Sequence, residues 1–159
     1  MSARNAFTAN ADGSFAVFLI GMRINKWWRP DLWLPVALSM GRMIKELRAH
    51  PELGLLGILP TGFANPIVLV QYWRSAEHLM RFAASRELTH LPAWTDYNKR
   101  VHATDAVGVW HETYVVEPGR HESVYVNMPA CGLGAAFGVV PAEGKRTSAR
   151  GRLNASLEP

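Results

Sequence analysis

The 159-residue sequence predicts an α+β fold, and two observations support this prediction. The hydrophobic patterns run strand, helix, strand twice over, which is the βαββαβ order of the ferredoxin-like fold with an antiparallel sheet. In the first strand, Phe15–Ile24, both alternating sets of side chains are apolar. Helices of the same chain cover one face of such a sheet, and the other face needs a partner. The sequence therefore predicts a homodimer joined through sheet faces.

Each predicted element follows from a local pattern. The elements are, in order, the strand Phe15–Ile24, the helix Pro35–His50, a bent strand Leu53–Leu59, the strand Pro66–Trp73, a helix from Ser75 to Ala84, a helix Leu88–Val101 and the strand Ala106–Val116. Pro35 suits the first turn of a helix, and Ser75 is a favourable N-cap. Gly54 and Gly57 weaken the second strand, which is why we expect it to bend.

The composition limits the class of protein. Apolar residues make up 48% and charged residues 19% of the chain, as in a globular domain. The net charge is +4, but part of the basic excess lies near the C-terminus and no nucleic-acid motif is present, so nucleic-acid binding is not expected. The longest apolar run, Phe15–Met22, is too short to span a bilayer and lacks signal-peptide flanks. We expect a cytoplasmic protein that does not bind membranes.

Two segments at the edges of the pattern have several interpretations. Trp27, Trp28 and Trp33 lie in a loop-like segment and could form a pocket rim, a membrane-surface anchor or, as we prefer, contacts in the core or dimer. We expect residues 15–133 to form the domain. Residues 134–159 are polar and weakly hydrophobic, which predicts a C-terminal extension that is partly disordered or partner-dependent.

The single cysteine, Cys131, excludes an internal disulfide.

The stretch Leu88–Val116 is the most informative, because it places titratable groups among packing residues. One helix face contains His90, Trp94, Tyr97 and Val101, which follow one another at spacings of four, three and four residues. This pattern places a histidine on an otherwise apolar face of the helix. His90 is therefore either a ligand for a cofactor or a histidine whose hydrogen bond is satisfied by a carbonyl at the start of the helix.

The strand that follows places His111 and Thr113 on one sheet face and Trp110, Glu112 and Tyr114 on the other. His111 and Glu112 are the predicted catalytic residues: His111 as a general base or substrate-positioning group, Glu112 as a residue that orients a histidine. The structural alternatives are a polar pair at the sheet edge and a place in the dimer interface. Because neighbouring residues face opposite ways, only one of the two can line a pocket, and we prefer His111.

A buried arginine needs a charged partner. Arg23 lies in an apolar strand, and Glu112 and Glu122 are the available carboxylates. We expect one of these ion pairs.

Four motifs carry a family resemblance, namely Phe18–Asn25, Gln71–Ser75, Gly108–Tyr114 and the segment from Glu122 to Leu133. In this order they resemble a small family grouped with a fumagillin-pathway monooxygenase. The resemblance implies a dimeric α+β barrel built from ferredoxin-like subunits. A shorter segment, Phe82–Tyr97, resembles the region around the proximal histidine of haem-dependent aldoxime dehydratases. That resemblance implies that His90 is the axial ligand of haem b.

The predicted function is a monooxygenase-like oxidoreductase that acts on a small hydrophobic molecule, with haem b or without a cofactor. The substrate would lie between sheet and helices, in a pocket lined by Arg23, Trp73, Trp94, Tyr97 and Trp110. One alternative is a haem-dependent lyase of the aldoxime dehydratase type. The other is a non-catalytic protein that binds haem or a hydrophobic ligand. Apart from the haem iron at His90, no metal site is expected.

Overall fold

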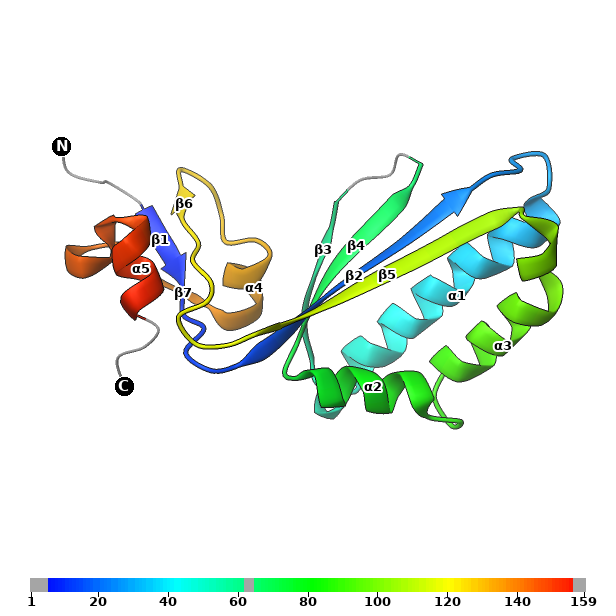
Figure 1. Cartoon of the computed structure of the whole chain (residues 1–159), viewed down its shortest axis with the longest axis horizontal. Coiled ribbons are helices and arrows are strands. Elements are labelled where there is room, and N and C mark those ends of the chain that lie inside the picture. The colour runs from blue at the N-terminus through cyan, green and yellow to red at the C-terminus, as the bar shows by residue number, and fades with distance from the viewer. Residues whose placement is uncertain (1–5, 62–64, 156–159) are drawn as a thin grey trace.

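The computed structural model describes residues 6–61 and 65–155, which form two units arranged end to end (Figure 1). The larger unit contains β2 (Phe15–Ile24), α1 (Pro30–Ala49), η1 (Pro51–Leu53), β3 (Leu55–Pro60), β4 (Ile67–Trp73), α2 (Ala76–Ala84), α3 (His90–Arg100), η2 (His102–Thr104) and β5 (Val107–Val116). The smaller unit contains β1 (Ala6–Ala9), β6 (Tyr125–Val126), α4 (Leu133–Phe137), β7 (Val139–Pro141), η3 (Gly144–Thr147) and α5 (Ala149–Ala155).

The sheet of the larger unit confirms the predicted fold class. Within the described residues, its four strands lie in the order β3-β4-β2-β5, and every neighbouring pair is antiparallel. One helix connects β2 to β3, and the pair α2 and α3 connects β4 to β5. This is the ferredoxin-like βαββαβ arrangement.

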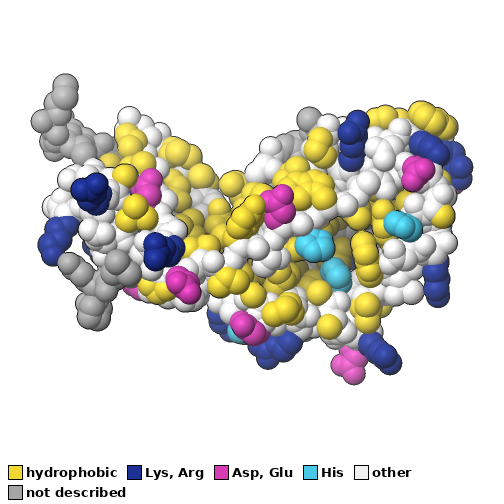
Figure 2. Space-filling model, viewed as in Figure 1, with side chains coloured by type: hydrophobic (Ala, Val, Ile, Leu, Met, Phe, Trp, Pro, Cys, Tyr) yellow, Lys and Arg dark blue, Asp and Glu magenta, His cyan; other side chains and the backbone are white. Residues whose placement is uncertain are grey.

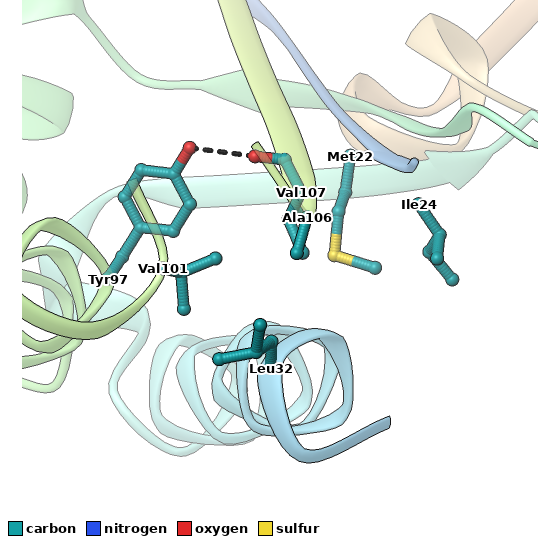
Figure 3. Close-up of a cluster of buried hydrophobic side chains, with 7 residues drawn as sticks. All are labelled: Met22, Ile24, Leu32, Tyr97, Val101, Ala106 and Val107. Carbon is teal, nitrogen blue, oxygen red and sulfur yellow. Dashed lines mark hydrogen bonds between the residues drawn. The ribbon is translucent and has the colours of Figure 1, made fainter. Parts of the chain in front are cut away.

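The helices α1, α2 and α3 lie against one face of this sheet (Figure 1). At one end of the interface, Met22 and Ile24 of β2 pack with Leu32 of α1 and with Tyr97 and Val107, as Figure 3 shows. At the other end, a second cluster packs around Trp73, which is 1% exposed. Between these clusters, the helices and the sheet leave room for a cavity.

The opposite face of the sheet is apolar and is not covered by these helices. It carries Val17, Leu19 and Gly21 of β2, which lie beside Tyr114, Glu112 and Trp110 of β5 respectively. The Trp110 indole lies directly over Gly21, where a Cβ atom would overlap it. Trp110 and Tyr114 remain 37% and 51% exposed. We call this surface the outer face.

The smaller unit brings the two ends of the chain together. β1 pairs with both β6 and β7, so residues near position 7 lie beside residues 125 and 141. Arg152 of α5 donates from Nε to the Glu122 carboxylate over 2.8 Å, and its side chain is only 8% exposed. α4 packs against β3, where a Cβ at Gly57 would come within 3.0 Å of Ala136. The expected division at residue 133 remains a prediction, and residues 156–159 of the extension lie outside the described residues.

The structure extends one predicted helix. α1 begins at Pro30, five residues before the predicted start at Pro35. Pro30 occupies the first turn, where a missing N–H removes no helical hydrogen bond, and Pro35 lies in the next turn. In the described part of the chain, no helix has both the length and the apolar character needed to cross a membrane.

Candidate functional site

A cavity of about 550 Å³ lies between the sheet and the helices. This volume is within the range of small-molecule sites in proteins. The sheet contributes Phe18, Ile20 and Gln71, and α1 contributes a run of apolar side chains that includes Met40 and Met43. Figure 2 shows a hollow between β5 and the helices, with histidine side chains beside hydrophobic ones. The arrangement suits a hydrophobic ligand that meets a few polar groups.

His90 reaches the cavity from the first residue of α3. Its Nδ1 atom lies 3.0 Å from the carbonyl oxygen of Ala83, and its ring lies 5.8 Å from that of Phe82. The start of α3 is held by Glu46 of α1, whose carboxylate accepts hydrogen bonds from the backbone N and the hydroxyl of Thr89. A carbonyl oxygen can only accept a hydrogen bond, so Nδ1 carries a proton, and in the neutral imidazole Nε2 is then the nitrogen with the lone pair.

His111 reaches the same cavity from the sheet. It lies opposite Ile20 of β2, and its ring is 5.5 Å from that of Phe18. The hydrogen bonds among the described residues include none to the imidazole of His111, which is also exposed. Thr113 lines the cavity on the same side, as the strand alternation predicts. Both ring nitrogens of His111 are therefore available to a ligand.

Three aromatic residues of the predicted pocket also line the cavity. Trp73 is buried and donates from Nε1 to Oε1 of Gln71 over 2.9 Å. Trp94 stacks on Tyr97 with ring centroids 5.3 Å apart, and the Tyr97 hydroxyl donates to the Val107 carbonyl over 3.0 Å. Burial raises the pKa of Tyr97 above its usual range, with a smaller contribution from Asp105. Trp94 is 45% exposed, which places it at the mouth of the cavity.

The structure places two predicted site residues away from the cavity. Glu112 lies on the outer face, where its carboxylate accepts a hydrogen bond of 2.5 Å from the Tyr114 hydroxyl. Arg23 is exposed and lies beside Gly108, on the same outer side of the sheet. Neither expected ion pair of Arg23 is present among the described residues, because Glu112 is four residues further along the sheet and Glu122 binds Arg152 instead.

Trp110 borders the cavity, but its indole covers Gly21 on the outer face. The loop tryptophans lie elsewhere: Trp27 and Trp28 are 56% and 72% exposed, and Trp33 packs against the core cluster of Figure 3. None of these three lines the cavity, so the pocket-rim interpretation is wrong.

The sequence did not identify the contribution of α1 to the cavity. The apolar stripe of this helix consists of Val36, Met40, Met43, Ile44 and Leu47, and all five of its members line the cavity. A periodic pattern identifies the inward face of a helix and does not distinguish a packed core from a cavity. Among the described residues, no group of three or more histidine, cysteine, aspartate or glutamate side chains is arranged to hold a metal ion.

These observations define a ferredoxin-like α+β domain with an apolar cavity between its sheet and helices. The chain belongs to the monooxygenase af470-like family, whose model matches residues 15–133. Monooxygenase af470 of Aspergillus fumigatus is 33% identical over 123 residues, which cover 72% of this chain and 43% of the relative. The family resemblance of the four sequence motifs is thereby confirmed.

Solved structures of aldoxime dehydratases share the fold. The enzyme OxdRE, crystallised with butyraldoxime, matches with a TM-score of 0.65 and 16% identity, over 84% of this chain and 39% of that chain. A second aldoxime dehydratase structure matches with a TM-score of 0.61 and 18% identity, over 79% of this chain and 38% of that one. The chain thus spans less than half the length of these proteins, and at these identities the structures establish the fold alone.

Proposed function

We propose that this chain is a monooxygenase-like oxidoreductase that acts on a small hydrophobic molecule bound in the cavity. One observation carries the proposal: His90 from the helices and His111 from the sheet line the same apolar cavity. A pair of titratable side chains in a mostly apolar pocket is typical of a reactive site. Membership of the monooxygenase af470-like family supports the reaction class.

We further propose that the cavity would hold haem b, with His90 as the residue that binds its iron. The side chain fits this role, because its Nδ1–H is held by the Ala83 carbonyl and Nε2 is left free to coordinate. The volume of the cavity and its apolar lining also fit a flat hydrophobic group. The iron, when bound, would supply the activation of oxygen or of the substrate.

His111 is proposed to hold and move the proton of the reaction. An imidazole nitrogen would accept a proton from the substrate hydroxyl, or donate one to it, as a general base or acid. The aromatic and methionine side chains that line the cavity would limit the access of water to a bound substrate. Without haem, the same base and dry pocket would suffice for a substrate whose deprotonated form reacts with oxygen directly. Glu112 has no part in this scheme, because it lies on the outer face.

A second candidate is a haem-dependent lyase that dehydrates aldoximes. The observation that favours it is again the histidine pair, since an acid–base group near an iron ligand would serve removal of water as well. A third candidate is a non-catalytic protein that binds haem or a hydrophobic ligand. Activity measurements distinguish the three candidate functions. The oxidoreductase would consume oxygen, the lyase would consume an aldoxime, and the binding protein would consume neither.

The proposed assembly is a homodimer in which two outer faces pack together. Its support is the apolar, uncovered surface of Val17 and Leu19, with Trp110 and Tyr114 exposed beside it. Packing two such sheets face to face would form the α+β barrel. A cytoplasmic location remains a prediction.

The test of the proposed function is oxygen uptake with a panel of hydrophobic phenols, measured for wild type, His111→Ala and Glu112→Ala. The two substitutions remove neighbouring polar side chains that face opposite sides of one strand. We expect His111→Ala to lower the rate by about 10²-fold or more and Glu112→Ala to leave it near wild type. Equal rates for wild type and His111→Ala would reject the catalytic role of His111.

A further inference from the structure

We propose that the side-chain amide of Gln71 binds an acceptor oxygen of the ligand. The ligand of the cavity would then be a hydrophobic molecule that carries a carbonyl or a similar oxygen. The inference rests on the proposed function, because it concerns the molecule that occupies the same cavity. It assigns a hydrogen-bond donor to a sheet wall on which Phe18 and Ile20 are apolar and His111 is the proposed acid–base group.

The orientation of the Gln71 amide follows from the chemistry of its neighbour. Trp73 lies two residues further along β4, on the same face, and its indole Nε1 is 2.9 Å from Oε1 of Gln71. An indole N–H is a donor only, so its partner must be the amide oxygen. The amide nitrogen, Nε2, therefore points away from Trp73 with both of its N–H groups. Trp73 is 1% exposed, so this orientation is held by a buried side chain.

The Nε2 atom of Gln71 has no acceptor among the residues that the structure describes. The hydrogen bonds of Gln71 among the described residues include its bond from Trp73 and none from Nε2. Among the described residues, every side-chain nitrogen or oxygen that is fully buried has a hydrogen-bond partner. Because Nε2 of Gln71 has none, it must be partly accessible. Gln71 is 4% exposed and lines the cavity, and the space that Nε2 reaches is therefore the cavity.

An unpaired amide donor in an apolar cavity has a free-energy cost that a ligand acceptor removes. Leaving such a donor without a partner is more unfavourable than the net gain from a typical hydrogen bond. For this reason, sites that hydrogen-bond a ligand reject analogues that lack the matching group. The sheet register places Gln71, Phe18 and Thr113 in one row, so the donor faces the same volume as His111, which lies in the next row.

The experiment compares two neutral probes of the same shape, 2-acetylnaphthalene and 2-isopropenylnaphthalene. The first carries a carbonyl oxygen where the second carries a methylene group. Binding of each probe to the protein as isolated is measured by equilibrium dialysis for wild type, Gln71→Met and Glu112→Met. Gln71→Met keeps the length of the side chain and removes the donor. Glu112→Met replaces a polar side chain by methionine on the outer face, away from the cavity, and serves as the matched control.

We expect wild type and Glu112→Met to bind the ketone about ten-fold more tightly than the alkene. We expect Gln71→Met to bind both probes equally, with its affinity for the alkene unchanged, which also shows that the variant is folded. Equal binding of the two probes by wild type, or a ketone preference that survives in Gln71→Met, would overturn the role of Gln71 alone. Binding of neither probe by any of the three proteins would overturn both this inference and the proposed function.

Discussion

The hydroxyl of Tyr97 donates a hydrogen bond of 3.0 Å to the carbonyl oxygen of Val107 (Figure 3). Tyr97 is a residue of α3, which begins with His90, and Val107 is the first residue of β5, which carries His111. The bond is buried, and it joins the helix and the strand that supply the two histidines. It therefore helps to fix the position of His90 relative to His111.

We predict that Tyr97→Phe lowers the free energy of unfolding by about 1 kcal/mol at pH 8, through loss of this buried hydrogen bond. The difference from wild type should shrink at high pH. Burial raises the pKa of Tyr97 in the folded protein above its value in the unfolded chain, which is near 10. The stabilisation by the Tyr97 hydroxyl is therefore complete below the pKa of the unfolded chain, and it is lost as the pH rises through the pKa of the folded protein. Urea unfolding of both proteins between pH 8 and pH 11 measures this. A constant difference across that range would contradict the assignment.

The outer face provides a test of the proposed dimer. Leu19→Lys places a lysine on the outer face directly opposite Glu112, and a single chain tolerates this cross-strand ion pair. In a dimer the lysine would be buried between the two apolar sheets, so we expect the substitution to prevent their packing. By light scattering, we expect wild type to have twice the chain mass of 17.7 kDa, as a dimer, and Leu19→Lys to have the mass of a single chain. Leu38→Lys is the control, because Leu38 lies on α1 and is 56% exposed. A monomeric wild type would contradict the dimer.

Glycine substitutions test the contact between Trp110 and β2. Gly21→Ala would place a methyl group into the indole of Trp110, and we expect it to destabilise the protein by about 1–3 kcal/mol. Gly41→Ala is the matched substitution in α1, where nothing lies within 4 Å of the new Cβ, and we expect it to stabilise the protein by about 0.5–1 kcal/mol. Thermal unfolding of the two variants should thus shift in opposite directions, and equal shifts would contradict this packing.

Local pattern predicted most of the larger unit. The strand Phe15–Ile24 has the bounds predicted from its two apolar sets, and β4 and β5 each begin one residue later than predicted. The helix after Ser75 is confirmed, with the Ser75 hydroxyl accepting from the His78 backbone N–H. Strand alternation correctly separated His111 from Glu112, because neighbouring residues must face opposite sides of a sheet.

Long-range contacts account for what the sequence did not predict. β1 pairs with strands more than a hundred residues away, and its four residues are too few to form a strong strand pattern of their own. The same reason applies to Arg23, whose expected partner Glu122 is taken by Arg152 of the smaller unit. The orientation of the Gln71 amide depends on the indole of Trp73, and the sequence does not show how these two side chains point toward each other.

The most direct test of the central claim is a titration of the purified protein with haemin, followed by absorbance. We predict that wild type and His111→Ala develop a Soret band that saturates at one haem per chain. We predict that His90→Ala does not, because it lacks the side chain proposed to bind the iron. No saturating Soret band in wild type, or an unchanged band in His90→Ala, would contradict the claim that His90 holds haem in this cavity.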